Sequence, residues 1–370
     1  MRISPVPLLR RATAGVAAVA ALCGPAHAEA AAPGPPAAQA QAEAQRLPFT
    51  ERYRALQHGG IVRAANTSVS CRTTGPAATP ACPVVRAGGS GANGDFDMFY
   101  VDVDDNPDTY NSSRAEVRMP AGSRVTYARL YWGGNLRVGE QKPARDDGRV
   151  LIAEPGGAYK ALLADTVVGH RVARGADAFQ ASADVTRLVR DSGSGLYTVA
   201  QVNAAMGRSA AGAWGGWTLV VAYENPRQPL RRLALWDGFD ALGPRTAQEV
   251  RLRGLRLPAH GAGLAGLVAY DGDRGRTGDS LTVSTGPGRT TALTGPADPR
   301  DDVLNSTISE AGASAPEREP SYANTLGYDS DVFELGTALR RGGDQLAFRL
   351  VSQRDAAWAG ALFVAVDARK

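Results

Sequence analysis

Apolar positions along the chain follow two patterns that β-strands produce. Residues 345–351 alternate, with Leu346, Phe348 and Leu350 on one side, which is typical of a strand with one buried face. Two runs, 217–223 and 361–366, are almost continuously apolar, as expected for central strands covered on both faces. Similar runs predict strands at 125–132, 149–153, 196–202, 217–224, 230–236, 263–270, 280–284, 345–352 and 360–367.

Glycine and proline separate these apolar runs. The 43 glycines and 23 prolines are spread along the chain, so many short strands with tight turns are expected. One segment, 184–190, predicts a helix of two turns with Asp184 as its acidic N-cap, ended by Gly193 and Gly195. We therefore predict an all-β protein: two consecutive β-sandwich (jelly-roll-like) domains with at most a few short helices.

The domain boundary is predicted at 225/226. Residues 225–229 contain Pro226 and Pro229 directly after an apolar strand, and proline disfavours both a helix and a strand ladder. The predicted domains are 49–225 and 226–370. The segment 213–224 resembles 357–367, which indicates either an internal duplication or the chance likeness of apolar strands.

Residues 1–28 have the features of a secretory signal peptide. Three arginines precede or flank the uncharged apolar run 12–22, and Ala26-His27-Ala28 provides a small-x-small cleavage pattern. A twin-arginine signal and a lipoprotein cysteine fit the flanking residues less well. Residues 29–48, rich in Ala, Pro and Gln, are expected to be a disordered spacer. No later segment is apolar enough to predict a membrane span, so we expect a secreted, extracellular protein.

Cleavage would change both the charge and the cysteine count. The whole chain has 41 basic and 37 acidic residues, whereas residues 1–28 hold three arginines and no acid. The remainder is nearly neutral, so its charge gives no reason to expect a nucleic-acid partner. Cys23 would also be removed, which leaves Cys71 and Cys82. An even pair in an exported chain predicts a disulfide.

A search for catalytic motifs finds one candidate, Gly278-Asp279-Ser280-Leu281. It matches the nucleophile block of GDSL esterases. In that family the block lies near the mature N-terminus of an α/β fold and a histidine base follows it. Here the last histidine, His260, lies upstream, and a serine without a base is a poor nucleophile. We therefore interpret the block as a turn entering a strand and predict a non-catalytic protein.

Acidic clusters are the candidate cofactor site. The candidate calcium ligands are Asp102, Asp104, Asp271, Asp273 and Asp279, since alternate acids in Gly-rich loops can provide the oxygen ligands that calcium prefers. A third cluster contains Asp329 and Asp331. The alternative is that these residues occupy ordinary turns or the solvent face of a strand. Calcium is the one cofactor that the sequence suggests, and no other cofactor is expected.

Aromatic residues in or beside the predicted strands could stack on sugar rings if they were exposed. The candidates are Tyr131, Trp132, Trp214, Trp217, Trp236 and Trp358. Because they lie next to glycines in apolar strands, we expect core packing instead.

Several ordered motifs resemble the N-terminal β-rich region of large secreted or cell-surface bacterial proteins, often actinobacterial, whose function is undefined. The motifs are 102–104, 111–113, 131–134, 183–186, 197–200, 216–224, 229–230, 237–239, 270–273, 278–281, 305–308 and 327–331. Those proteins commonly continue into conserved-repeat β-sandwich domains. This chain has neither repeats nor an LPxTG sorting signal after Lys370, so covalent wall anchoring is not expected.

Three functions remain open from the sequence. The leading one is a secreted, surface-associated or adhesin-like module that binds an extracellular protein or a cell-wall glycan. The second is a secreted hydrolase that acts on glycans with two carboxylates. The third is a purely structural assembly module. The sequence does not indicate an oligomeric state.

Overall fold

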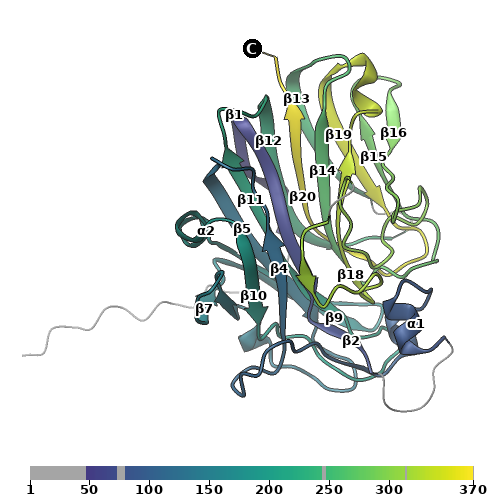
Figure 1. The fold of residues 1–370 in the computed structure, drawn as a ribbon. Coiled ribbons are helices and arrows are strands. Elements are labelled where there is room, and N and C mark those ends of the chain that lie inside the picture. The colour runs from purple at the N-terminus through teal and green to yellow at the C-terminus, as the bar shows by residue number, and fades with distance from the viewer. Residues whose placement is uncertain (1–46, 73–79, 244–246, 313–314, 370) are drawn as a thin grey trace, which may run out of the picture. The chain divides into compact units, whose positions relative to one another are not determined.

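A nine-stranded antiparallel sheet runs through both halves of the protein (Figure 1). The computed structural model describes residues 47–72, 80–243, 247–312 and 315–369. The predicted signal peptide and most of the predicted spacer lie outside these residues. In spatial order the strands are β18 (Tyr328–Glu334), β14 (Gly263–Tyr270), β20 (Trp358–Asp367), β12 (Leu230–Ala241), β1 (Leu47–Thr67), β11 (Gly215–Glu224), β5 (Arg124–Asn135), β9 (Ala176–Asp184) and β8 (Thr166–Ala173).

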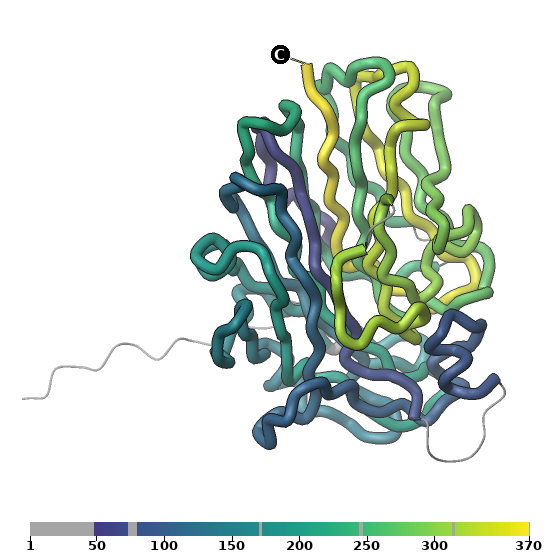
Figure 2. The backbone as a smooth tube through the Cα atoms, viewed as in Figure 1, coloured from purple at the N-terminus to yellow at the C-terminus, as the bar shows by residue number. Residues whose placement is uncertain are grey.

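The long first strand joins the two halves. From Leu47 to His58, β1 pairs with β12, and from Gly59 to Thr67 it pairs with β11. Figure 2 shows this purple segment between strands of the two halves. The predicted boundary at 225/226 falls in the turn between β11 and β12, but the sheet continues across it. The described residues from 47 onward form one compact unit.

Two smaller sheets complete the two sandwiches. A five-stranded sheet contains β17 (Arg318–Glu319), β4 (Ser112–Val117), β10 (Gly195–Ala200), β6 (Arg149–Ala153) and β7 (Lys160–Leu163). It packs on β5, β9 and β11 to form the N-terminal sandwich, around Trp132, Tyr197 and Trp217. A four-stranded sheet contains β13 (Ala247–Leu257), β19 (Gly343–Val351), β15 (Ser280–Ser284) and β16 (Thr290–Ala292). It packs on β12, β14, β18 and β20 to form the C-terminal sandwich, around Trp236, Phe348 and Leu362.

A third core lies on the opposite face of the nine-stranded sheet. The rings of Phe239 and Trp358 stack there at 5.2 Å, and Tyr270 packs against Phe239 at 5.8 Å. Gln180 on β9 donates to the Gly238 carbonyl on β12 at 3.0 Å and accepts from the Tyr270 hydroxyl at 3.0 Å. Three other strands separate β9 from β12, so the sheet is strongly curved at this point.

The predicted strands are confirmed, and so is the all-β fold with few helices. Leu346, Phe348 and Leu350 face the core of the C-terminal sandwich, at most 2% exposed. The predicted helix is α2 (Thr186–Ser192). The N-cap residue is Val185 and not the predicted Asp184, which lies one residue earlier and accepts a hydrogen bond from the Thr186 amide at 2.8 Å; the helix ends before Gly193. The 3-10 turns are Asn93–Asp95, Ala144–Asp146 and Ala338–Arg341.

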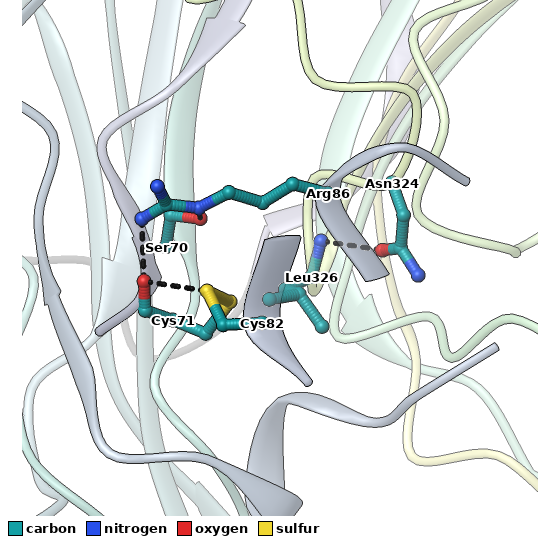
Figure 3. Close-up of a disulfide and its surroundings, with 6 residues drawn as sticks. All are labelled: Ser70, Cys71, Cys82, Arg86, Asn324 and Leu326. Atoms are coloured by element: carbon teal, nitrogen blue, oxygen red, sulfur yellow. Dashed lines mark hydrogen bonds between the residues drawn. A yellow bond between two sulfur atoms is a disulfide. The ribbon is translucent and has the colours of Figure 1, made fainter. Parts of the chain in front are cut away.

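The predicted disulfide between Cys71 and Cys82 is confirmed (Figure 3). It joins β2 (Val69–Cys71), which pairs with β3 (Met98–Tyr100), to the short helix α1 (Cys82–Arg86). Arg86 donates to the Ser70 hydroxyl at 2.9 Å and to the Cys71 carbonyl. The disulfide packs with Leu326 in a small apolar cluster, so it anchors α1 against a loop of the C-terminal half. Among the described residues, no helix is long and apolar enough to cross a membrane.

Candidate functional site

Eight buried aspartates gather at one end of the C-terminal sandwich, and we call this group the carboxylate centre. They come from the segment between β14 and β15, the segment after β16, strand β18 and the turn before β20. Each is at most 6% exposed, although aspartate is among the residues least often buried. They are Asp271, Asp273, Asp279, Asp298, Asp302, Asp329, Asp331 and Asp355.

Strand β18 brings two of these carboxylates into the sandwich. Asp329 pairs with Ala269, and Asp331 pairs with Leu267 on the neighbouring strand β14. Because side chains alternate along a strand, both aspartates lie on the same face as Phe333, which belongs to the core. The segment 305–309 covers them: the Thr307 amide donates to Asp329 at 3.2 Å, and the Ser309 amide donates to Asp331 at 2.9 Å.

The Thr307 hydroxyl is shared among three acceptors in this part of the centre. Its oxygen lies 2.9 Å from Asp298 Oδ1, 3.0 Å from Asp331 Oδ1 and 2.8 Å from the side-chain amide oxygen of Asn305. A hydroxyl has one hydrogen to donate. The Asn305 amide nitrogen is engaged with the Ala297 carbonyl at 2.7 Å, which fixes its oxygen toward Thr307. One hydroxyl hydrogen cannot satisfy all three acceptors, so a proton or a cation at the two carboxyls would stabilise this arrangement.

Four carboxylate oxygens of the centre have no hydrogen-bond partner among the described residues. They are Asp279 Oδ1, Asp302 Oδ1, Asp329 Oδ2 and Asp331 Oδ2. The other oxygens of Asp279 and Asp302 accept from the Leu304 amide at 2.6 Å and from the Gly275 amide at 2.9 Å. Buried polar atoms are nearly always paired in folded proteins, so these four oxygens require an explanation.

Gly272 leaves room for two oxygens, one from Asp329 and one from the Leu304 carbonyl. A Cβ atom at Gly272 would lie 2.5 Å from Asp329 Oδ2 and would also collide with the Leu304 carbonyl oxygen. The unpartnered oxygen of Asp329 therefore lies beside the backbone of Leu304. The Leu304 amide also donates to Asp279.

The remaining carboxylates are well paired. Asn93, from the N-terminal half, donates to Asp271 at 2.9 Å through its side chain and to Asp273 at 3.3 Å through its amide. Asp355 accepts from the Asp273 amide at 2.6 Å. Arg276 lies 3.0 Å from Asp273, and this is the one ion pair that the described residues make with the centre. Arg63 and Arg274 lie near enough to act electrostatically on Asp298, Asp302 and Asp331 without forming an ion pair with them.

Burial raises the pKa of every carboxyl group in the centre. Burial and the neighbouring Asp355 raise the pKa of Asp273 to about 7, and burial raises that of Asp279 to about 7 and that of Asp355 to about 6. Burial also raises the pKa values of the other five aspartates, and the rise is largest for Asp271, Asp329 and Asp331. Ionised forms of these groups are unfavourable unless a cation balances them.

The structure separates the five predicted calcium ligands. Asp271, Asp273 and Asp279 belong to the carboxylate centre, but of these three only Asp279 has an unpartnered oxygen. Asp102 and Asp104 lie in the loop after β3, where Asp102 accepts from Ser112 at 2.6 Å and Asp104 accepts from Thr109 at 2.9 Å. Within the described part of the chain, no group of three or more His, Cys, Asp or Glu side chains is arranged to hold a metal ion.

The other sequence candidates occupy structural positions. Gly278 lies in a turn with a φ of 128°, and Ser280 begins β15, so the Gly-Asp-Ser-Leu block is a turn that enters a strand. The aromatic candidates are at most 4% exposed: Tyr131, Trp132, Trp214, Trp217, Trp236 and Trp358. They pack in the cores, so these residues do not form an exposed sugar-stacking surface.

Sequence reasoning missed Asp298, Asp302 and Asp355 as members of the centre. Each is isolated from the predicted acidic clusters along the chain, and only the fold brings them together. One signal was present in β18, where Asp329 and Asp331 alternate within a strand that otherwise has core residues. Acids at core positions of a strand indicate a buried polar site.

Comparisons with known proteins give little information about function. No protein-family model matches the chain, and no curated protein matches it in sequence. The major capsid protein P2 of bacteriophage PM2 is 10% identical with a TM-score of 0.19, over 84% of this chain and 98% of its own. A structure from Sulfolobus turreted icosahedral virus is 8% identical with a TM-score of 0.21, over 84% and 91%. TM-scores this low carry no argument about the fold. The all-β assignment therefore rests on the strands and sheets described above.

Proposed function

We propose that this protein is an exported, non-catalytic structural β-module whose C-terminal sandwich is stabilised by calcium bound at the carboxylate centre. The observation that carries the proposal is the set of unpartnered, buried oxygens on Asp279, Asp302, Asp329 and Asp331. An ionised carboxylate in such a position is costly unless a cation or a proton neutralises it.

Calcium fits the chemistry of the site. It prefers six to eight oxygen ligands and accepts carboxylate, carbonyl and water oxygens in flexible arrangements. The candidate ligands are Asp279 Oδ1 and Asp329 Oδ2, with the Leu304 carbonyl on the Asp329 side. Two carboxylates completed by backbone and water oxygens are enough for a weak site of the kind found in extracellular modules, with a Kd of roughly 10⁻⁴ to 10⁻³ M.

The position of the site explains how calcium would act structurally. Asp329 belongs to the nine-stranded sheet, whereas Asp279 directly precedes β15 of the four-stranded sheet. A cation between them would connect the two layers of the C-terminal sandwich at one end. It would also hold the segment 302–309, which makes the main backbone contacts with both aspartates.

A structural role agrees with how the chain uses its polar residues. Asp237, which is 1% exposed, accepts from Arg52 at 2.8 Å and from the Tyr131 hydroxyl at 3.0 Å. Asn66 connects strand β1 to the carbonyls of Arg114 and Glu319 at 2.9 and 2.8 Å. These buried polar groups connect strands of different layers. The aspartates of the carboxylate centre likewise connect β18 and β15 to the segment 302–309.

Thermal unfolding with and without calcium tests the proposal. Chelation with EDTA should lower the melting temperature, and millimolar calcium should restore it, because a ligand that binds only the folded state stabilises it by RT ln(1 + [L]/Kd), which is about 0.4–1.4 kcal/mol for 1 mM calcium and a Kd of roughly 10⁻³ to 10⁻⁴ M. Asp279→Asn keeps the shape of the side chain and the Leu304 contact but removes the charge, so this variant should not respond to calcium.

Asp301→Asn is the matched control, because Asp301 is exposed on the same segment as Asp302. It should respond to calcium as the parent protein does. The same melting temperature in EDTA and in calcium would contradict the proposal. It would indicate that protons, and not calcium, neutralise the carboxylates of the centre. An equal calcium response in Asp279→Asn and the parent would contradict the assigned ligand.

A further inference from the structure

A buried arginine of the N-terminal half reaches the backbone that covers the carboxylate centre. Arg63 lies on β1 opposite Val220 of β11 and is 5% exposed. Because side chains alternate along a strand, Arg63 lies on the same face as Ile61 and Ala65, which belong to the third core. A guanidinium buried in this way needs partners, and it finds them on the C-terminal half.

Arg63 holds one short segment, residues 304–310, which we call the strap. Its Nη2 donates to the Ser309 carbonyl, and its Nη1 lies 3.2 Å from Glu310 Oε1. The same Ser309 carbonyl accepts from the Val332 amide of β18 at 3.1 Å. Arg63 therefore fixes the strap to the N-terminal half at the residue where the strap also pairs with β18.

The other part of the strap contacts the proposed calcium ligands. The Leu304 amide donates to Asp279 at 2.6 Å, and the Thr307 amide donates to Asp329 at 3.2 Å. The Leu304 carbonyl lies beside the unpartnered oxygen of Asp329. A shift of the strap would therefore move the backbone groups that orient both ligands.

The strap has a strained conformation between these two sets of contacts. Ser306 has a φ of 58°, in the left-handed region that residues other than glycine rarely adopt. Such a conformation persists only where the surrounding structure holds it. The Ser306 carbonyl accepts from the Thr325 amide at 2.8 Å, and its hydroxyl accepts from the Gly327 amide at 2.7 Å. These contacts come from the C-terminal half, and Arg63 supplies a contact from the N-terminal half.

We infer that Arg63 is a positioning residue of the proposed calcium site, so that a residue of the N-terminal half sets how tightly the C-terminal sandwich binds calcium. The inference rests on the proposed function and adds a requirement outside the ligands themselves. Arg63 acts through the strap and not as a ligand, because a guanidinium has no acceptor atom to offer a cation.

A purely electrostatic effect of Arg63 predicts the opposite change in calcium affinity. Arg63 lies near enough to Asp298 and Asp331 to act on them through its charge. A positive charge beside the centre repels calcium, so removal of the charge alone would tighten calcium binding. Loss of the contact with the strap would weaken binding. The direction of the change in Kd therefore separates the two mechanisms.

Equilibrium dialysis with radioactive calcium should be carried out on the parent, Arg63→Gln and Arg63→Lys. Arg63→Gln removes the charge and the reach to the strap. Arg63→Lys keeps the charge but lacks the planar group that contacts Ser309 and Glu310 together. The matched control is Arg129→Gln, because Arg129 is also a buried arginine of the nine-stranded sheet, 2% exposed, and its ion pair with Asp165 lies within the N-terminal half.

The Kd for calcium should rise by about tenfold in Arg63→Gln, as expected from the loss of one charge-assisted hydrogen bond. Arg63→Lys should show a smaller rise. Arg129→Gln should be less stable than the parent but keep its Kd, since it does not contact the strap. Hydrogen–deuterium exchange in EDTA provides a readout without calcium: peptides that cover the strap should exchange faster in Arg63→Gln than in the parent and in Arg129→Gln.

An unchanged or lower Kd in Arg63→Gln would overturn the inference, and a lower Kd would assign Arg63 an electrostatic effect only. Unchanged exchange of the strap in Arg63→Gln would overturn it as well. Absence of calcium binding by the parent would contradict the proposed function and the role of Arg63 at a calcium site, whereas the exchange in EDTA would still show whether Arg63 holds the strap. If circular dichroism shows that Arg63→Gln is unfolded, Arg63→Lys and Glu310→Gln test the same contact with a smaller change.

Discussion

In the absence of calcium, raising the pH from about 5 to about 8 should destabilise the folded protein. Asp273 and Asp279 have pKa values of about 7 in the folded state because they are buried, against an ordinary value near 3.8. At pH values between these two pKa values, the folded state binds protons that the unfolded state has lost. The free energy of unfolding therefore falls as the pH rises. Above pH 7 both states are ionised and the decline ends.

The size of the effect follows from the pKa values. One proton contributes about 1.4 kcal/mol per pH unit. From about pH 5 to pH 7, Asp279 alone should lower the free energy of unfolding by roughly 2–3 kcal/mol, and Asp273 should add a similar amount. Asp279→Asn remains neutral at every pH, so it should lose its share of this slope and be more stable than the parent at pH 8 in EDTA.

Urea unfolding followed by tryptophan fluorescence measures this slope, since Trp132, Trp214 and Trp217 are buried in the folded state. The titration is carried out in EDTA from about pH 5 to pH 8, with Asp301→Asn as the exposed control. A stability that is flat or rising over this range would refute the reasoning. So would an identical slope in the parent and Asp279→Asn.

Three further predictions concern the scaffold. Replacing Cys71 and Cys82 by alanine should cost about 3 kcal/mol in the chain-entropy model, measured by denaturant unfolding with the reduced parent as control. Asp237→Asn should cost about 1.5–3 kcal/mol because buried Asp237 accepts charge-assisted hydrogen bonds from Arg52, and adding Arg52→Gln should recover part of this loss, whereas strictly additive losses would contradict the coupling. Gly272→Ala should lower the melting temperature and weaken calcium binding together, because the new Cβ meets Asp329 and the Leu304 carbonyl; normal stability and calcium response would show that this close approach is unimportant.

The strands could be predicted because their apolar patterns are local. Residues 345–351 alternate and residues 361–366 are apolar throughout, and these patterns specify one or two buried faces without knowledge of the partners. The first strand was not predicted, since Gly59 and Gly60 interrupt a stretch with many polar residues. Its pairing with both β11 and β12 depends on long-range contacts, so no local pattern predicts that one sheet contributes to both sandwiches.

The carboxylate centre could be predicted only in part for the same reason. Asp271, Asp273 and Asp279 are close in sequence, and the fold keeps them together. Asp104 belongs to an equally acidic segment, yet it is satisfied by local contacts with Asn106 and Thr109. Spacing along the chain does not separate these cases, because burial decides whether an aspartate needs a cation or a proton.

The resemblance to secreted bacterial proteins and the export signal stay predictions, and secretion can be checked by N-terminal sequencing of protein from the culture medium. Cleavage after Ala28 would leave a chain that begins at Glu29. An uncleaved, cell-retained protein would contradict the exported role. The calcium site would then need another source of millimolar calcium.

A crystal structure of the protein grown with calcium tests the central claim most directly. Anomalous scattering should show one calcium ion bound by Asp279 and Asp329, with calcium–oxygen distances of about 2.3–2.6 Å, and no such peak in crystals of Asp279→Asn. A calcium-soaked parent crystal with no anomalous peak at the carboxylate centre, and with the same four oxygens still unpartnered, would contradict the account.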